Sequence, residues 1–349
     1  MSTLARIGVF GAGAVGGTIG GLLALAGRDV TLIGQWREHI DAVRTHGLRI
    51  VDAAGTRVAH PRIMHHEELK TLQQPFDVVL LCVKSYDTEW AVQAVAPHLA
   101  PAGFVASLQN GINETRIAAI VGVARTVGVG ISTIGANATE PGEVVRTSSK
   151  GGGKHTVFRA GEIDGRLTPR LEALVELLNI VDSAKATDNL MGERWSKLVI
   201  NSITHGLAAA TGLNSRALMA STALRPLTIR LAAEGVRVGR AQHLQLVDIY
   251  GAGADTWLAA ERGEAPALAD IEKGLQARYV RATEDERPSV ALDIMRGRRS
   301  ELEFTSGALV ARARELGIAV PAQEALYAAA RRVERGELKA APENTNAFA

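Results

Sequence analysis

The sequence predicts a doubly wound α/β domain of the Rossmann type, followed by an all-helical domain. The first half alternates short apolar runs with helical patterns, as expected for strands and helices that build a parallel sheet. From about Asp188 to Arg335 the pattern is helical almost throughout. A length of 349 residues suits two domains. We place the Rossmann-type domain at residues 1–187, the helical domain at 188–341, and a disordered tail at 342–349.

The first predicted strand and helix carry the most informative motif. Gly11, Gly13 and Gly16 have the G-x-G-x-x-G spacing, between an apolar run at Arg6–Phe10 and a helical pattern at Val15–Ala26. The first glycine permits a tight turn, the second lets a pyrophosphate approach the backbone, and the third lets the helix pack closely on the sheet. We therefore expect a dinucleotide to contact Gly11, Ala12, Gly13, Ala14, Val15 and Gly16.

The same region, Ile7 to Gly27, has no charged residue, so a signal peptide or membrane span is the alternative. Its many glycines favour the strand, turn and helix. The remaining strands are expected at Asp29–Ile33, Asp77–Val83, Phe104–Leu108, Thr126–Ser132 and Lys154–Ala160, with a hairpin of Leu48–Asp52 and Thr56–Ala59. The segment 248–286 could form helices of a lid or interface, but we favour a solvated surface insertion.

Composition excludes several classes of protein. Lys and Arg number 39 and Asp and Glu 37, without a basic run, so we expect no nucleic-acid partner. The single cysteine, Cys82, excludes an internal disulfide and fits a cytoplasmic protein. Because it lies in an apolar run, we expect a buried structural thiol. We expect neither a membrane segment nor a metal ion.

The end of the second predicted strand indicates which dinucleotide binds. NAD-binding domains usually carry a carboxylate there for the ribose 2′-hydroxyl, whereas NADP-binding domains place a cation there. Here the strand is followed by Gln35, Trp36 and Arg37. Gln35 and Arg37 can bind a 2′-phosphate, and Glu38 is expected in the next helix. These residues favour NADP (NADPH) over NAD.

Polar side chains also follow two later strands. Lys84 comes directly after the strand at Asp77–Val83, and Asn110 follows Phe104–Leu108 in the turn Gln109-Asn110-Gly111. The carboxyl ends of parallel strands hold the ligand in such sheets, so both side chains are candidates to contact cofactor or substrate.

The helical half contributes a polar stripe. Lys197, Asn201 and His205 are spaced four residues apart and therefore share one helix face, surrounded by apolar residues. Such a stripe indicates a cleft or an exposed face. Downstream, Ser289 and Asp293 share a face of another helix, which Gly297 ends. Ser300 and Glu303 have the spacing of a capping box, whereas Glu301 is unexplained by capping.

Together these motifs resemble those of the ketopantoate reductases (2-dehydropantoate 2-reductases). The resemblance rests on Gly11-Ala12-Gly13-Ala14-Val15-Gly16, Val83-Lys84, Gln109-Asn110-Gly111, Trp195-x-Lys197-Leu198-x-x-Asn201 and Ser289-x-x-x-Asp293 with Gly297-Arg298-x-Ser300-Glu301. It implies NADPH-dependent reduction of a 2-oxo acid, by default ketopantoate to pantoate, in a cleft between a Rossmann domain and a helical domain. A homodimer is the expected assembly.

The resemblance also implies roles for individual residues. Lys197 would be the general acid, and Lys84 would lie by the cofactor. Asn110, Asn201, Ser289 and Glu301 would hold the substrate or orient the lysine. A lysine ammonium supplies both a proton and a positive charge where negative charge develops on the carbonyl oxygen. We also treat His205 and Asp293 as substrate-binding candidates, and Lys84 and Arg298 as candidates for the substrate carboxylate.

The chain departs from the family pattern at a few positions. His205 stands where the family usually has a second asparagine, Ser300 stands for Thr, and Leu302-Glu303 stand for Ile-Asp. The segment before Arg287 is also longer than expected. These departures concern the substrate and not carbonyl reduction, so a reductase of another 2-oxo acid or an imine is the first alternative. A non-catalytic NADP-sensing protein is a further alternative, against which the joint presence of Lys197, Asn201 and Glu301 argues.

Overall fold

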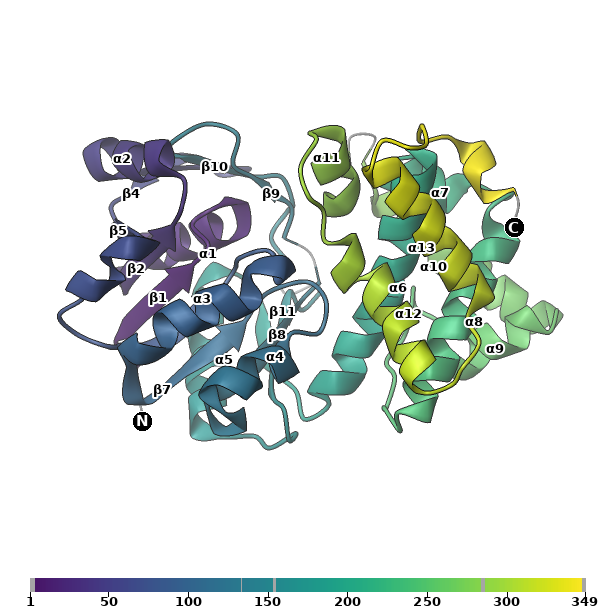
Figure 1. The fold of residues 1–349 in the computed structure, drawn as a ribbon, viewed down its shortest axis with the longest axis horizontal. Coiled ribbons are helices and arrows are strands. Elements are labelled where there is room, and N and C mark those ends of the chain that lie inside the picture. Colours follow the sequence, from purple (N-terminus) through teal and green to yellow (C-terminus); the bar gives the residue numbers. More distant parts are fainter. Residues whose placement is uncertain (1–3, 133, 153–154, 284–285, 347–349) are drawn as a thin grey trace. The chain divides into compact units, whose positions relative to one another are not determined.

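The computed structural model describes residues 4–132, 134–152, 155–283 and 286–346 (Figure 1). The chain divides into two compact units, Met1–Leu190 and Met191–Ala349. The first combines a mostly parallel sheet with helices, and the second is helical, so the predicted fold class is confirmed.

The first unit is built on an eight-stranded sheet with the order β12-β11-β8-β7-β6-β1-β2-β5. Its strands are β1 (Arg6–Phe10), β2 (Asp29–Gly34), β5 (Arg62–His65), β6 (Phe76–Leu81), β7 (Leu99–Ser107), β8 (Thr126–Ile131), β11 (Phe158–Glu162) and β12 (Ala184–Ala186). All neighbouring pairs are parallel except β11 with β8. From β1 the chain proceeds to β2 and β5 on one side and returns to β6 on the other. In such a sheet, ligands bind at the carboxyl ends of the strands near this reversal.

Helices cover both faces of this sheet because its strands are apolar on both faces. Along β1, Ile7 and Val9 join one core with residues of α1 (Ala14–Leu25) and α5 (Pro169–Val181). Phe10 joins a second core with residues of α3 (Thr88–Val95) and α4 (Glu114–Val121). Short 3-10 helices η1 (His66–Thr71), η2 (Ser85–Asp87), η3 (Ala96–His98) and η4 (Val123–Arg125) lie in the connections.

A smaller sheet with the order β4-β3-β10-β9 completes the first unit. It contains β3 (Leu48–Asp52), β4 (Gly55–Ala59), β9 (Ala136–Asn137) and β10 (Glu143–Arg146), and it follows helix α2 (Arg37–His46). The antiparallel pair β3–β4 confirms the predicted hairpin. The pairing of β10 with β3 joins residues far apart in the sequence and was not predicted.

The structure also bears on three further predictions, for the uncharged N-terminal stretch, for the strand at Lys154–Ala160 and for Cys82. The uncharged stretch from Ile7 to Gly27 forms β1, a turn and α1, and among the described residues no helix has the length and apolar character needed to cross a membrane. The strand expected at Lys154–Ala160 is β11, which begins at Phe158, and Lys154 lies outside the described residues. Burial raises the pKa of the Cys82 thiol to about 12, as suits a structural cysteine.

The second unit consists of packed helices. They are α6 (Leu190–Thr211), α7 (Ser215–Ala220), α8 (Arg225–Ala241), α9 (Ala254–Glu261), α10 (Ala265–Arg281), α11 (Ser289–Met295), α12 (Ser306–Glu315) and α13 (Pro321–Glu334), with 3-10 helices η5 (Leu302–Phe304) and η6 (Pro342–Thr345). Helix α6 packs on α8, where the Trp195 indole Nε1 donates to the carbonyl oxygen of Gly235 at 2.9 Å.

The segment 248–286 contributes to this helical core. It contains α9 and α10, and the side chains of Trp257, Ile271 and Leu275 are buried. The Trp257 indole donates to the carbonyl oxygen of Ile249 at 3.0 Å. The favoured interpretation as a solvated surface insertion is therefore wrong, because one side of each helix is packed.

The end of the chain is more ordered than expected. The sequence predicts disorder over residues 342–349, but Pro342–Thr345 form η6 and Thr345 is buried. The Asn344 Nδ2 donates to the carbonyl oxygen of Ala210, at 2.9 Å, which ties this turn to the end of α6. Residues 347–349 lie outside the described residues.

Candidate functional site

The turn between β1 and α1 has the shape that a dinucleotide phosphate needs. Gly11 has φ +108°, and a Cβ on it would lie 2.6 Å from the carbonyl carbon of Cys82. A Cβ on Gly16 would lie 2.1 Å from the carbonyl oxygen of Gly11. A Cβ on Gly13, in contrast, would meet nothing within 4 Å. The two outer glycines are therefore required for packing, and the middle one faces open space.

The backbone around this open space is suited to an anion. Helix α1 begins at Ala14, and its N-cap is Gly13, which has no side chain to bond the first N–H groups. Ala12 is buried, and its N–H donates to the carbonyl oxygen of Ile33 at 3.2 Å. The first-turn N–H groups of a helix lack partners within the helix and carry its positive dipole end. These residues fit a pyrophosphate group.

Beside the residues that follow β2, the structure places a carboxylate from the neighbouring strand β5 that was not predicted. Gln35 and Arg37 are exposed, and Glu38 lies in the first turn of α2 as predicted. The Arg37 guanidinium Nη2 donates to Glu67 Oε2 at 2.8 Å. Glu67 follows β5, which pairs with β2 so that Gly34 lies opposite His65. The sequence signal for it was weak, because only Ile63 and Met64 are apolar in the short strand that precedes Glu67 and Glu68.

The predicted loops after β6 and β7 are tied together. The Gln109 amide Nε2 donates to the carbonyl oxygen of Val83 at 3.1 Å. The carbonyl oxygen of Asn110 accepts from Ser85 Oγ at 2.8 Å and from Asn113 Nδ2 at 2.9 Å. These bonds fix the backbone of the Asn110 turn and do not involve its side-chain amide. Lys84 is the N-cap of η2 on the adjoining loop, so both predicted residues lie at the carboxyl edge of the sheet.

In the second unit, Lys197, Asn201 and His205 share one face of α6 as predicted. Asn201 and His205 are buried, and Lys197 is half-buried. The packing face of α6 lies elsewhere, because Trp195 and Val199 contact α8 at Gly239 and Gly235. At 3.6 residues per turn the two faces are roughly 130° apart. The polar stripe is thus separate from the contact with α8.

Asn201 has an unused donor. Asn201 is only 9% exposed, and its buried side-chain Nδ2 has no hydrogen-bond partner within the described residues. A buried amide N–H without a partner costs roughly 1–3 kcal/mol. Its place beside Lys197 on α6 makes it suited to bind a ligand oxygen.

Glu301 is held near the same helix by the segment that follows it. The Ser306 hydroxyl donates to the carbonyl oxygen of Ser202 at 3.2 Å, and Ser202 directly follows Asn201 on α6. Glu301 itself is buried, and its carbonyl oxygen accepts from Thr305 Oγ1 at 3.2 Å. The structure therefore brings the segment carrying Glu301 beside the middle of α6.

The capping box predicted from Ser300 and Glu303 does not form. The Ser300 N–H donates to Glu334 Oε1 at 3.0 Å, and the Ser300 hydroxyl donates to the same oxygen. Glu303 is exposed and lies 3.4 Å from Arg299. Glu334, at the end of α13, supplies the carboxylate that was expected from Glu303.

Ser289 and Asp293 lie on α11 as predicted. Ser289 is half-buried and Asp293 is buried. Gly297 ends this helix with φ +63°, and the N–H of Arg298 donates to the carbonyl oxygen of Asp293 at 2.8 Å, which is a Schellman motif. Arg298 is exposed just beyond this turn.

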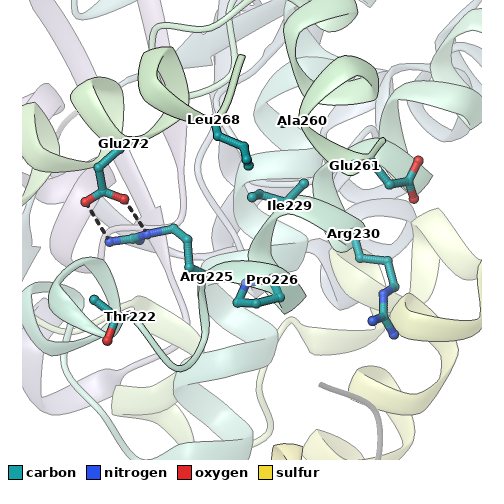
Figure 2. Close-up of a pocket in the computed structure, with 9 residues that line it drawn as sticks. All are labelled: Thr222, Arg225, Pro226, Ile229, Arg230, Ala260, Glu261, Leu268 and Glu272. Atoms are coloured by element: carbon teal, nitrogen blue, oxygen red, sulfur yellow. Dashed lines mark hydrogen bonds and ion pairs between the residues drawn. The ribbon is translucent and has the colours of Figure 1, made fainter. Parts of the chain in front are cut away.

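A pocket of about 480 Å³ lies in the second unit, away from the predicted residues (Figure 2). It is lined from α8 by Arg225 and Ile229 and from α10 by Leu268 and Glu272, among others. Two of the lining residues form an ion pair, with Arg225 Nε 2.8 Å from Glu272 Oε2. Its lining includes none of the predicted site residues, so we assign it no part in catalysis.

One group of the described residues could in principle hold a metal ion. Ligand atoms of His65, His66 and Glu67 lie within 4.8 Å of one another. His65 Nδ1 already accepts from the N–H of Glu67, and Glu67 already pairs with Arg37. We assign no metal to this group.

Comparisons with known proteins match both units of the chain to the same protein family. The family model described as "Ketopantoate reductase PanE/ApbA" matches residues 7–157, and "Ketopantoate reductase PanE/ApbA C terminal" matches residues 189–334. A 2-dehydropantoate 2-reductase of Halobacterium salinarum is 33% identical over 321 residues, which cover 90% of this chain and 94% of that relative.

Solved structures extend the likeness. A PanE/ApbA family ketopantoate reductase from Ralstonia eutropha JMP134 is 26% identical with a TM-score of 0.75, covering 95% of this chain and 99% of that one. A D-mandelate dehydrogenase with NADH and anilino(oxo)acetate has a TM-score of 0.77, covering 95% of this chain and 98% of that one. At 20% identity, this second likeness concerns the fold alone.

Proposed function

Because this chain belongs to the ketopantoate reductase family of oxidoreductases, we propose that it catalyses NADPH-dependent reduction of a 2-oxo acid to a 2-hydroxy acid. The default substrate is 2-dehydropantoate (ketopantoate), which would place the enzyme in pantothenate biosynthesis. The observation that carries the proposal is the polar face of α6, where a half-buried lysine stands one turn from a buried amide with an unused donor.

The residues of α6 support the chemistry of carbonyl reduction. The bound dinucleotide would supply the hydride. Lys197 would donate a proton to the carbonyl oxygen and stabilise the negative charge that develops there. The Asn201 Nδ2, with no partner among the described residues, would donate a hydrogen bond to the substrate. Glu301 would orient Lys197 from the segment tied to α6 by Ser306.

Other residues would bind the reactants. Asn110, at the carboxyl edge of the sheet, would contact nicotinamide or substrate, and Lys84 on the neighbouring loop would lie by the cofactor. Ser289, Asp293 and His205 would contact the substrate. The preference for NADPH is supported by the lack of a carboxylate on the end of β2 and by Gln35 and Arg37 there.

One alternative substrate class stands beside the default. His205 is buried on the face that carries Lys197, so a different 2-oxo acid or an imine is the second candidate substrate. A non-catalytic NADP-sensing role is not proposed, because the chain belongs to an enzyme family.

We further propose a cytoplasmic homodimer without a nucleic-acid partner. Light scattering can test the oligomeric state, and cell fractionation can test the location.

The proposal is tested by NADPH oxidation with ketopantoate and a panel of 2-oxo acids. Lys197→Ala should lower kcat by roughly 10²- to 10⁴-fold, the usual contribution of a general acid. Lys273→Ala, the same change at an exposed position of α10, is the matched control and should leave kcat unchanged. Turnover of another 2-oxo acid but not ketopantoate would replace the default substrate. Equal rates for Lys197→Ala and Lys273→Ala would contradict the role of Lys197.

A further inference from the structure

The carboxyl ends of β2 and β5 bring an arginine and a glutamate together at the edge where a dinucleotide's adenosine ribose is expected. The two strands are parallel neighbours, with Gly34 opposite His65. Arg37 begins the helix after β2, and Glu67 lies in the first turn after β5. Their side chains pair at 2.8 Å. The residues after β2 lack the carboxylate that usually binds the ribose of NAD. Glu67, which follows the neighbouring strand β5, places a carboxylate at the same edge of the sheet.

Local structure fixes the backbone that carries Glu67. His65 and Glu68 form a capping box at the start of η1, in which the N–H of His65 donates to Glu68 Oε2 at 2.8 Å. The N–H of Glu67 donates to His65 Nδ1 at 3.4 Å. The Glu67 side chain nevertheless stays 61% exposed, and that of Arg37 68%. The hydrogen bond from Arg37 lowers the pKa of Glu67, so this carboxylate is ionised at neutral pH.

We propose that Glu67 limits the enzyme's preference for NADPH over NADH. The proposal rests on the proposed function, because it requires the ribose to bind at the end of β2. A 2′-phosphate there would be attracted by Arg37 but repelled by Glu67, since the phosphate carries a charge of about −1.5 to −2 at neutral pH. A ribose 2′-hydroxyl can instead donate a hydrogen bond to the same carboxylate. The pair therefore accepts both cofactors and weakens the discrimination that Arg37 alone would give.

The exposure of the pair sets the size of the effect. An ion pair this exposed contributes little to folding, so Glu67 can be changed without loss of the fold. The repulsion between a carboxylate and a phosphate dianion a few ångströms apart at a protein surface corresponds to roughly three- to tenfold in affinity.

The test measures nucleotide binding by calorimetry on the full chain, with adenosine 2′,5′-bisphosphate and 5′-AMP as probes. Glu67→Gln should bind the bisphosphate roughly three- to tenfold more tightly than wild type and bind 5′-AMP no better. Asp41→Asn is the matched control, because it makes the same charge change on exposed α2, four residues after Arg37. It should leave both affinities unchanged. Arg37→Gln should weaken bisphosphate binding and reduce the effect of Glu67→Gln.

Steady-state kinetics supply a second readout. In Glu67→Gln the KM for NADPH should fall while kcat at saturating NADPH stays within about twofold of wild type, because only cofactor binding changes. If Glu67→Gln and Asp41→Asn bind the bisphosphate alike, or if Glu67→Gln binds it more weakly, the inference is wrong while the proposed function stands. If the wild type binds no nucleotide and reduces no 2-oxo acid, the proposed function fails and the inference fails with it.

Discussion

An alanine substitution at Gly13 should mainly weaken dinucleotide binding, whereas one at Gly16 should mainly lower the stability of the fold. A Cβ at Gly13 would meet no atom of the described residues within 4 Å, and the φ of Gly13, −80°, is accessible to alanine. A Cβ at Gly16 would lie 2.1 Å from the carbonyl oxygen of Gly11 and 2.9 Å from Cys82 Cβ. Gly13→Ala therefore fills space that a pyrophosphate needs, whereas Gly16→Ala fills space that the protein itself occupies.

The expected magnitudes follow from these distances. Gly13→Ala should lower the free energy of unfolding by at most about 1 kcal/mol, the cost of a poorer N-cap. It should weaken NADPH binding at least about tenfold, or ~1.4 kcal/mol. Gly16→Ala gains up to about 1 kcal/mol of helix propensity. The required backbone shift outweighs this gain, so we expect a net loss of about 1–3 kcal/mol.

Urea unfolding followed by circular dichroism gives the first quantity, and calorimetric titration with NADPH gives the second. The two variants serve as each other's control, because they add the same methyl group three residues apart. Wild-type NADPH affinity in Gly13→Ala would refute the reasoning, since the open space would then not be where the pyrophosphate binds. Wild-type stability in Gly16→Ala would show that the turn relaxes without cost.

Two further predictions concern buried polar groups. Asn201→Ala should lower kcat/KM for ketopantoate by roughly 10- to 100-fold, because a hydrogen-bond donor to the substrate is lost. The free energy of unfolding in urea should change by less than about 1 kcal/mol, since Nδ2 makes no hydrogen bond to any residue that the structure describes. A wild-type kcat/KM in this variant would contradict the role of Asn201. Burial opposes ionisation of Asp182, but hydrogen bonds from Arg146, Ser183 and Gly151 lower its pKa. Because the folded pKa lies below the unfolded value of about 3.9, the stabilisation is present above that pH and is lost as pH falls. Unfolding free energies between pH 7 and 3 should therefore fall less steeply in Asp182→Asn than in wild type, and parallel curves would contradict this assignment.

Local patterns predicted the first unit well. The strand at Arg6–Phe10, the glycine turn and α1 follow from apolar periodicity and glycine spacing, which act over a few residues. The same holds for the loops after β6 and β7, because polar residues directly after apolar runs mark the carboxyl ends of parallel strands. The hairpin β3–β4 was likewise predicted from two short runs and a glycine turn.

Partners distant in sequence could not be predicted in the same way. Glu67 lies 30 residues after Arg37, and its pairing depends on β5 lying beside β2. Ser300 has a carboxylate at the capping-box spacing, yet its partner is Glu334, 34 residues away. For Ser300 the local motif predicted the correct type of interaction but the wrong partner, whereas the ion pair of Arg37 was not predicted at all. In both cases tertiary packing determines which carboxylate makes the contact.

The polar face of α6 shows what the structure adds to a pattern that the sequence did reveal. From spacing alone, the stripe could have faced solvent. Trp195 and Val199 fix the rotation of the helix, because turning it by roughly 130° to exchange the two faces would remove the indole from Gly235 and its neighbours on α8. Burying a tryptophan stabilises a fold by several kcal/mol, roughly 3–5 in substitution data, so the core of the second unit imposes the burial of Asn201 and His205. The Asn201 amide donor lies one turn from Lys197 and has no partner among the residues that the structure describes. Its burial therefore costs stability, and binding of a ligand oxygen would offset that cost.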